Sequence, residues 1–133
     1  MVDRVLVVED DSDLRTLVEF KLLKRGFEAT TVADGKSALE LLKQEKFDVV
    51  ILDLMLPKLS GFQVLRQLLE ELGSLPAKFI VVSAMSNEED ILQALNLGVS
   101  EYMVKPFSLE VLVAQVRKLL GKLPGQIVNP DSA

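Results

Sequence analysis

Polar side chains that could carry out chemistry follow four short apolar segments of the sequence, each directly after its segment ends. They are Glu9 and Asp10, then Asp53, then Ser83, then Lys105. Short apolar runs rich in β-branched residues and bounded by turn residues are typical of buried strands in parallel sheets. The carboxyl ends of such strands share one edge of the sheet, where ligands bind in open α/β folds. We therefore expect these side chains to converge, with Asp53 at the centre of the site.

The predicted cluster combines carboxylates with a hydroxyl and an ammonium group. Carboxylates held close together repel one another unless a cation lies between them. Mg²⁺ meets this need, because it is a hard cation that takes oxygen ligands. Acids, a metal site, the Ser83 hydroxyl and the Lys105 ammonium are together what an incoming phosphoryl group requires. The pattern therefore predicts phosphoryl chemistry.

Each of these residues has an ordinary structural explanation when it is taken alone. An acid after a strand often caps a helix, and a serine there often lies in a turn. A lysine before a proline is usually a solvated surface residue. The combination at four strand ends of one chain is what favours a functional site.

Segments typical of strands and of helices alternate five times along the chain. The predicted strands are Arg4–Val8, Glu28–Val32, Val49–Leu52, Lys78–Val82 and Tyr102–Val104. Apolar residues at helical spacing follow each strand, and these helices are predicted to begin at the caps Ser12, Asp34 and Ser108, at the capping box Ser86–Glu89, and at about Phe62. The alternation predicts an α/β fold with a five-stranded parallel sheet and helices on both faces.

The composition excludes several classes of protein. The 133 residues suit one domain, and 49% hydrophobic with 26% charged residues is ordinary for a globular protein. The chain has no Cys and no His, which excludes disulfides, thiolate nucleophiles, histidine-based zinc sites and Ser-His-Asp catalysis. Its net charge of −5 argues against direct binding of nucleic acid.

The apolar runs also bear on location and on the domain boundary. They are too short to span a membrane. The first, Val5–Val8, is followed at once by acids, which is unlike a signal peptide, so we expect a cytoplasmic protein. After Gly121 the composition turns to Pro, Gly, Asn, Asp and Ser. We expect residues 1–121 to form the domain and 122–133 to be a linker or disordered C-terminal tail.

Four stretches of the sequence resemble the receiver domain of the response regulators of two-component signalling. They are VLVVEDD (Val5–Asp11), VVILDLMLPKLSGF (Val49–Phe62), IVVSA (Ile80–Ala84) and EYMVKPF (Glu101–Phe107). The resemblance runs from Asp3 to Gly121 and is highly specific, because the four motifs occur together. It implies a flavodoxin-like, doubly wound sheet with the strand order 2-1-3-4-5.

The resemblance implies roles for the acidic residues. Asp53 would accept the phosphoryl group as an aspartyl phosphate. Mg²⁺, or Mn²⁺ in its place, would be bound directly by Asp10, Asp53 and the backbone carbonyl of Met55, and through a water molecule by Glu9. Glu9 departs from the family pattern, in which Asp is more common, but its longer side chain can still reach a metal-bound water.

Three other residues would respond to the phosphoryl group. Ser83, which replaces a frequent Thr, would hydrogen-bond it, and Lys105 would pair with it. Tyr102 would turn inward as Ser83 moves toward the phosphate. The face formed by the fourth helix, the last strand and the last helix would change as a result. The Lys105–Pro106 peptide bond is expected to be cis.

The chain would catalyse its own phosphorylation and dephosphorylation without being a conventional enzyme. In this family, the second residues after the phosphoacceptor and after the hydroxyl residue flank the path of the attacking water. Here these residues are Met55 and Met85, and neither can hydrogen-bond and orient water. We therefore expect slow autodephosphorylation.

The implied partners follow from the absence of His. The phosphoryl group would come from a sensor histidine kinase, a histidine phosphotransfer protein or a small donor such as acetyl phosphate. The changed face would regulate a downstream effector protein or domain, or bind a second copy as a homodimer. Ile91, Val111 and Gln115 stand where one large transcription-factor subfamily uses charges to dimerise, which argues against that particular dimer.

Three other functions fit parts of the pattern. A nucleotide-binding module of the same fold class would need glycines after the first strand, where this chain has acids. An aspartyl phosphohydrolase would resemble Asp-x-Asp, but Met55 stands two residues after Asp53. The third alternative is a pseudo-receiver, an unphosphorylated protein-interaction module, although the complete set of acids, Ser and Lys argues against it.

Overall fold

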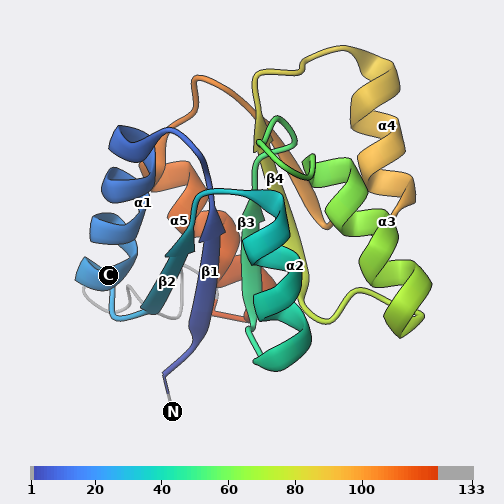
Figure 1. The fold of residues 1–133 in the computed structure, drawn as a ribbon. Coiled ribbons are helices and arrows are strands. Elements are labelled where there is room, and N and C mark those ends of the chain that lie inside the picture. Colours follow the sequence, from blue (N-terminus) through green and yellow to red (C-terminus); the bar gives the residue numbers. More distant parts are fainter. Residues whose placement is uncertain (1, 123–133) are drawn as a thin grey trace.

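Strands and helices alternate along the whole of the chain that the computed structural model describes, residues 2–122 (Figure 1). The strands are β1 (Arg4–Val8), β2 (Glu28–Val32), β3 (Val49–Leu52), β4 (Lys78–Ser83) and β5 (Glu101–Val104). The helices are α1 (Ser12–Lys24), α2 (Gly35–Gln44), α3 (Gly61–Leu72), α4 (Glu88–Asn96) and α5 (Leu109–Leu119). The predicted tail, 122–133, lies outside the described residues apart from Lys122.

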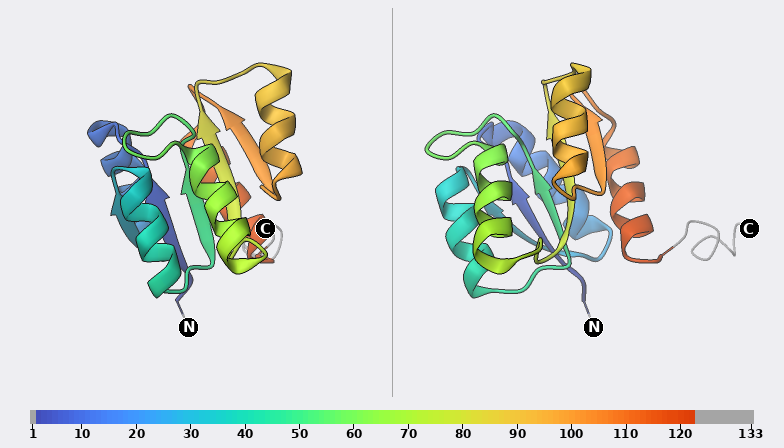
Figure 2. Two further views of the ribbon diagram at one scale, coloured as in Figure 1. Left: turned by 45° about the vertical axis from the view of Figure 1, so that its right-hand side comes forward. Right: turned by 90° about the vertical axis from the view of Figure 1, so that its right-hand side faces the viewer.

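The strands form one parallel sheet in the order β2-β1-β3-β4-β5, which confirms the predicted doubly wound fold. β1 and β3 pair in register, with Val5 opposite Val49 and Val8 opposite Leu52. The residues that follow these two strands are therefore neighbours. All strands point the same way, so their carboxyl ends share one edge of the sheet (Figure 2).

Alternate residues of the central strands bury into two separate cores, because successive side chains of a strand point to opposite faces. Leu6, Val8 and Val50 pack under α2, α3 and α4, and Val5 and Val7 pack under α1 and α5. Continuous apolar runs are what a sheet covered on both faces requires. Among residues 2–122, none of the helices is both long and apolar enough to cross a membrane.

Two of the predicted helix caps differ from the observed ones by one residue. The cap of α1 is Asp11 instead of Ser12, because the Asp11 carboxylate accepts the backbone N–H groups of Asp13 and Leu14. The predicted capping box Ser86–Glu89 is wrong: Asn87 caps α4 and accepts the N–H of Asp90. Several adjacent polar residues could cap each helix, and the path of the preceding loop selects one. The caps Asp34 and Ser108 are confirmed.

The loop between β3 and α3, residues 53–60, is tightly constrained at its base. The N–H of Gly61 donates to the carbonyl of Leu54 at 2.9 Å. A Cβ on Gly61 would lie 2.5 Å from the backbone oxygen of Asp53, so only glycine allows α3 to begin this close to the end of β3. At the end of β5, the Lys105–Pro106 peptide bond is cis, as the resemblance implied.

Candidate functional site

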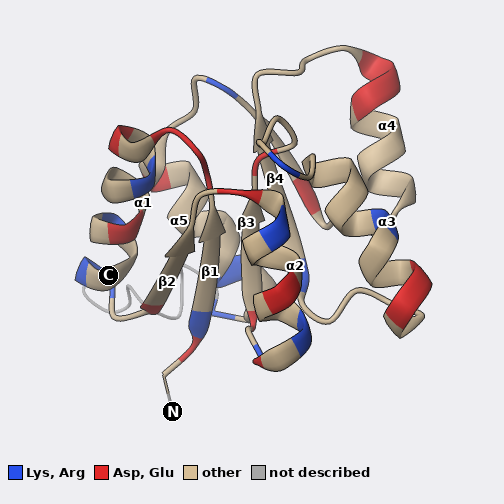
Figure 3. Ribbon diagram, in the orientation of Figure 1, with Lys and Arg blue, Asp and Glu red and all other residues tan. Residues whose placement is uncertain are grey.

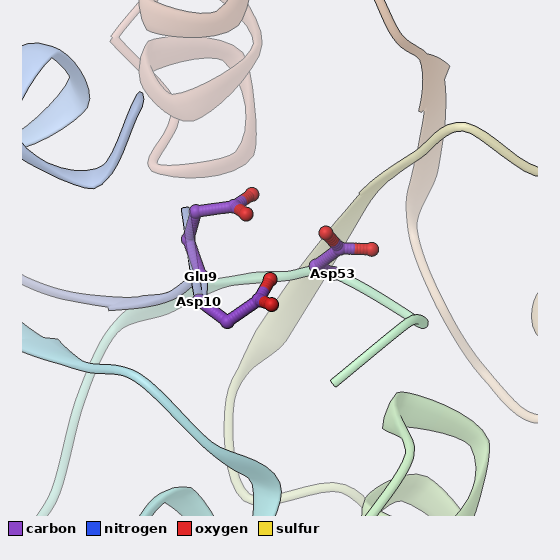
Figure 4. Close-up of side chains that lie close together, drawn as sticks. All are labelled: Glu9, Asp10 and Asp53. Atoms are coloured by element: carbon purple, nitrogen blue, oxygen red, sulfur yellow. The ribbon is translucent and has the colours of Figure 1, made fainter. Parts of the chain in front are cut away.

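Acidic residues follow the carboxyl-terminal ends of β1 and β3 at one edge of the sheet (Figure 3), and Glu9, Asp10 and Asp53 meet there. One carboxylate oxygen from each lies within 4.8 Å of the others, and Figure 4 shows the three side chains grouped at the ends of β1 and β3. Glu9 and Asp53 are only 2% and 3% exposed, whereas Asp10 is exposed. The predicted convergence of the acids is therefore observed, and the acids differ in their access to solvent.

The Lys105 ammonium bridges the two buried acids. Its Nζ lies 2.7 Å from Asp53 Oδ2 and 2.9 Å from Glu9 Oε1. Burial alone would lower the pKa of Lys105, but its pairing with the Asp53 and Glu9 carboxylates outweighs burial and the pKa is raised. Burial raises the pKa of Glu9 although Lys105 opposes the change. Lys105 is thus held in its charged form and is directed at Asp53.

The other oxygen of Asp53 is bound by the loop that follows β3. The backbone N–H of Met55 donates to Asp53 Oδ1 at 2.9 Å. The Met55 side chain is 57% exposed, so only its backbone is part of the cluster. Both carboxylate oxygens of Asp53 therefore have a partner, one from the loop and one from Lys105.

Ser83 and Tyr102 are linked through the loop that follows β4. Ser83 is fully buried, and its Oγ accepts the backbone N–H of Met85 at 3.2 Å. The Tyr102 hydroxyl donates to the Met85 carbonyl at 2.6 Å, and burial raises the pKa of that phenol. The Tyr102 ring packs against the core beneath α2, α3 and α4. Met85 therefore connects the strand-end serine to the aromatic residue of β5.

The acids fit a hard divalent cation. The donor atoms are all oxygens, which Mg²⁺ prefers. Glu9 Oε1 is buried and, within the described part of the chain, accepts no hydrogen bond of good geometry, although Lys105 lies near it. Lys105 pairs with the charge of this oxygen, but a buried carboxylate oxygen that accepts no well-aligned hydrogen bond still carries a cost, which a metal ion or its bound water would remove.

Arg15 is a part of this region that the sequence reasoning missed. Its Nη1 donates to the backbone carbonyl of Glu9 at 2.8 Å and lies 3.4 Å from that of Asp10. These bonds fix the loop that carries both acids. The sequence feature that could have indicated this role is a basic residue one turn into a helix that follows an acidic loop.

Comparison with known proteins agrees with this geometry. The family model described as "Response regulator receiver domain" matches residues 5–117. The Bacillus subtilis alkaline phosphatase synthesis transcriptional regulatory protein PhoP is 36% identical over 132 residues, covering 99% of this chain and 53% of PhoP. The Mycolicibacterium smegmatis sensory transduction protein RegX3 is 44% identical over 116 residues, covering 87% of this chain and 50% of RegX3. The chain thus spans about half the length of these relatives.

Solved structures give the same result. The receiver domain of the Francisella response regulator 1452 superposes with a TM-score of 0.84 at 31% identity, covering 90% of this chain and 98% of that chain. The BeF₃-activated receiver domain of DrrB gives a TM-score of 0.79 at 31% identity, covering 91% and 99%. From the family match, these likenesses and the cluster of acids that Lys105 bridges, it follows that the chain belongs to the receiver domain family of two-component response regulators.

Proposed function

We propose that the chain is a phosphoacceptor switch in which Asp53 takes a phosphoryl group from a histidine kinase or a histidine phosphotransfer protein. The observation that supports this most is the environment of Asp53. Its carboxylate is buried at the edge of the sheet, is contacted by Lys105 Nζ at 2.7 Å and lies within 4.8 Å of two further acids. A structural aspartate would not need a second and a third carboxylate beside it.

In the proposed reaction, a carboxylate oxygen of Asp53 attacks the phosphorus of the donor. The bond between phosphorus and the donor nitrogen breaks, and the electron pair of that bond leaves with the donor. Lys105 moves from Asp53 Oδ2 to a phosphoryl oxygen and stabilises the charge there. The Ser83 hydroxyl, which now accepts the N–H of Met85, donates to another phosphoryl oxygen.

The metal ion would be held by Asp10, Asp53 and the Met55 carbonyl, with Glu9 bound through a water molecule. When bound, Mg²⁺ would neutralise the carboxylates and the phosphoryl oxygens. Asp10 is the exposed member of the cluster, so it offers a route by which the ion can enter.

We propose that α4, β5 and α5 form the face that changes on phosphorylation and binds a partner. Tyr102 connects this face to Ser83 through Met85, and the face carries the exposed apolar side chains of Leu92, Leu95, Val104 and Val111. A downstream effector protein or domain, or a second copy of this chain, would bind there. The domain would span residues 1–121, followed by a linker in 122–133, and would act in the cytoplasm.

The alternative, a pseudo-receiver that is never phosphorylated, has less support. A domain that only binds other proteins has no need for a lysine that bridges two buried acids. Beryllofluoride, which imitates the phosphoryl group, and acetyl phosphate both test the two functions directly.

The experiment is mass spectrometry after incubation with acetyl phosphate and Mg²⁺. The wild type should gain the mass of one phosphoryl group, and Asp53→Asn should gain none. Asp13→Asn, which removes an exposed acid from the first turn of α1, is the matched control and should be phosphorylated normally. Label on the Asp53→Asn variant, or none on the wild type, would contradict the proposal.

A further inference from the structure

We propose that Gly35, the first residue of α2, positions the loop between β3 and α3 for metal binding. The proposal rests on the proposed function, because it concerns the loop that carries the Met55 carbonyl. Gly35 belongs to α2 and is not one of the clustered acids. It would act sterically, because the lack of a side chain there makes room for the loop.

The tip of the loop rests directly on Gly35. The backbone N–H of Gly35 donates to the carbonyl of Pro57 at 3.4 Å. A Cβ on Gly35 would overlap the Leu59 carbonyl oxygen and would lie 2.7 Å from the carbonyl carbon and 2.8 Å from the Leu59 Cβ. The φ of Gly35 lies outside the left-handed region, so the need for glycine here comes from the neighbouring backbone.

The loop is therefore held both at its base and at its tip. At the base, Gly61 N–H bonds to the carbonyl of Leu54, and Met55 N–H bonds to Asp53. At the tip, Leu59 N–H bonds to Pro57, whose carbonyl also accepts from Gly35. The Met55 carbonyl lies between this base and the tip. Displacing the tip should move the Met55 carbonyl relative to the carboxylates.

The contact of Leu59 with Gly35 depends on an unusual backbone conformation at Lys58. This residue has a φ of +70°, which is uncommon for a residue other than glycine. Its Nζ is also 3.9 Å from Asp34 Oδ2, and Asp34 caps α2 by accepting the N–H of Ser37 at 2.7 Å. The left-handed turn at Lys58 brings Leu59 onto Gly35, so both residues should affect the loop in the same way.

The first test compares Gly35→Ala with Gly73→Ala. Gly73 caps α3 at φ +83° and has nothing within 4 Å of a Cβ, so Ala there strains the backbone without displacing the loop. Mg²⁺ titration of the unphosphorylated protein, followed by the amide chemical shift of Met55, gives the Kd. Gly35→Ala should raise the Kd on the order of tenfold, as mutation of residues that orient metal ligands does, and Gly73→Ala should leave it unchanged.

The second test uses Lys58→Val and Lys58→Gly, which decide the question if Gly35→Ala fails to fold. Both remove the same charge and the contact with Asp34. They differ in their tolerance of a positive φ, which Gly accepts and a β-branched residue does not. Lys58→Val should bind Mg²⁺ several-fold more weakly than Lys58→Gly, on the same scale as other losses of ligand orientation.

The outcomes separate this inference from the proposed function. A folded Gly35→Ala variant that binds Mg²⁺ like the wild type would overturn the positioning role, and so would equal affinities of the two Lys58 variants. A purely structural role would lower the unfolding free energy of Gly35→Ala and leave its Kd for Mg²⁺ unchanged. Failure of the wild type itself to bind Mg²⁺ and to be phosphorylated would instead contradict the proposed function.

Discussion

Lys105 Nζ lies 2.7 Å from Asp53 Oδ2 and, on its other side, 2.9 Å from Glu9. The ammonium group therefore occupies the gap between two buried carboxylates that would otherwise repel each other. In the proposed reaction, the same lysine must leave this position to bind the phosphoryl group. The stability of the metal-free protein and its reactivity should thus depend on one side chain.

The first prediction concerns Lys105→Met. Removing one partner of a buried ion pair leaves the other charge without compensation, so the unfolding free energy in EDTA should fall by about 3 kcal/mol. Mg²⁺ should restore part of the loss, because the cation can neutralise the same carboxylates. Denaturant unfolding with and without Mg²⁺ measures both effects. Lys118→Met, at a position that is 61% exposed, is the control and should change stability little.

The second prediction is a pH dependence at Glu9. Its folded-state pKa is raised by burial, so the native protein binds this proton more tightly than the unfolded chain does. Ionised Glu9 therefore lowers the unfolding free energy above its folded-state pKa. This cost disappears as the pH falls toward the unfolded-state pKa of about 4.5. Glu9→Gln should raise the unfolding free energy at pH 7 in EDTA, and the difference from the wild type should shrink toward pH 4. A difference that is constant with pH would contradict the assignment.

The third prediction concerns metal binding by Asp10. Asp10→Asn removes an anionic ligand, so Mg²⁺ binding and phosphorylation should both weaken. The metal-free variant should be more stable than the wild type, because repulsion among the acids is relieved. The gain should be smaller than for Glu9→Gln, since Asp10 is exposed. Lower stability of the metal-free variant would indicate that Asp10 has a structural role instead.

The fourth prediction concerns the link between Tyr102 and Met85. Beryllofluoride binding at Asp53 should shift the amide resonances of Tyr102 and of α4 (Glu88–Asn96), because Met85 contacts both Ser83 and Tyr102. Tyr102→Phe removes the hydrogen bond but keeps the ring, so the shifts in α4 should become smaller while beryllofluoride still binds. Shifts confined to the surroundings of Asp53 in the wild type would refute this route.

The fifth prediction is a long lifetime for phosphorylated Asp53. Met85 is partly buried against the core and Met55 is exposed, and neither side chain can orient an attacking water. The double variant Met55→Asn/Met85→Glu should lose its phosphoryl group on the order of tenfold faster, which corresponds to about 1.4 kcal/mol in the barrier. The decay of phosphorylated Asp53 in each protein measures this. Equal decay rates would mean that the methionines do not protect the phosphoryl group.

The sequence alone placed the strands almost to the residue and predicted that Asp53 lies beside other acids at the carboxyl-terminal edge of the sheet, as it does. Both follow from local properties. A run such as Val49–Leu52 can only be buried on both faces, and the polar residue that ends it must then lie at the edge of a parallel sheet. The same logic located Glu9, Ser83 and Lys105, because every strand of this sheet ends at the same edge.

Relationships between segments far apart in the chain were decided only by the tertiary structure. Glu9 and Asp10 are adjacent and chemically alike, yet one is buried against Lys105 and the other is exposed. The cap at Asp11, the bond from Tyr102 to Met85 and the contact of Gly35 with Leu59 likewise depend on how loops meet. A local pattern records which face of a strand is apolar, but the distance between two loops depends on the packing of every element between them.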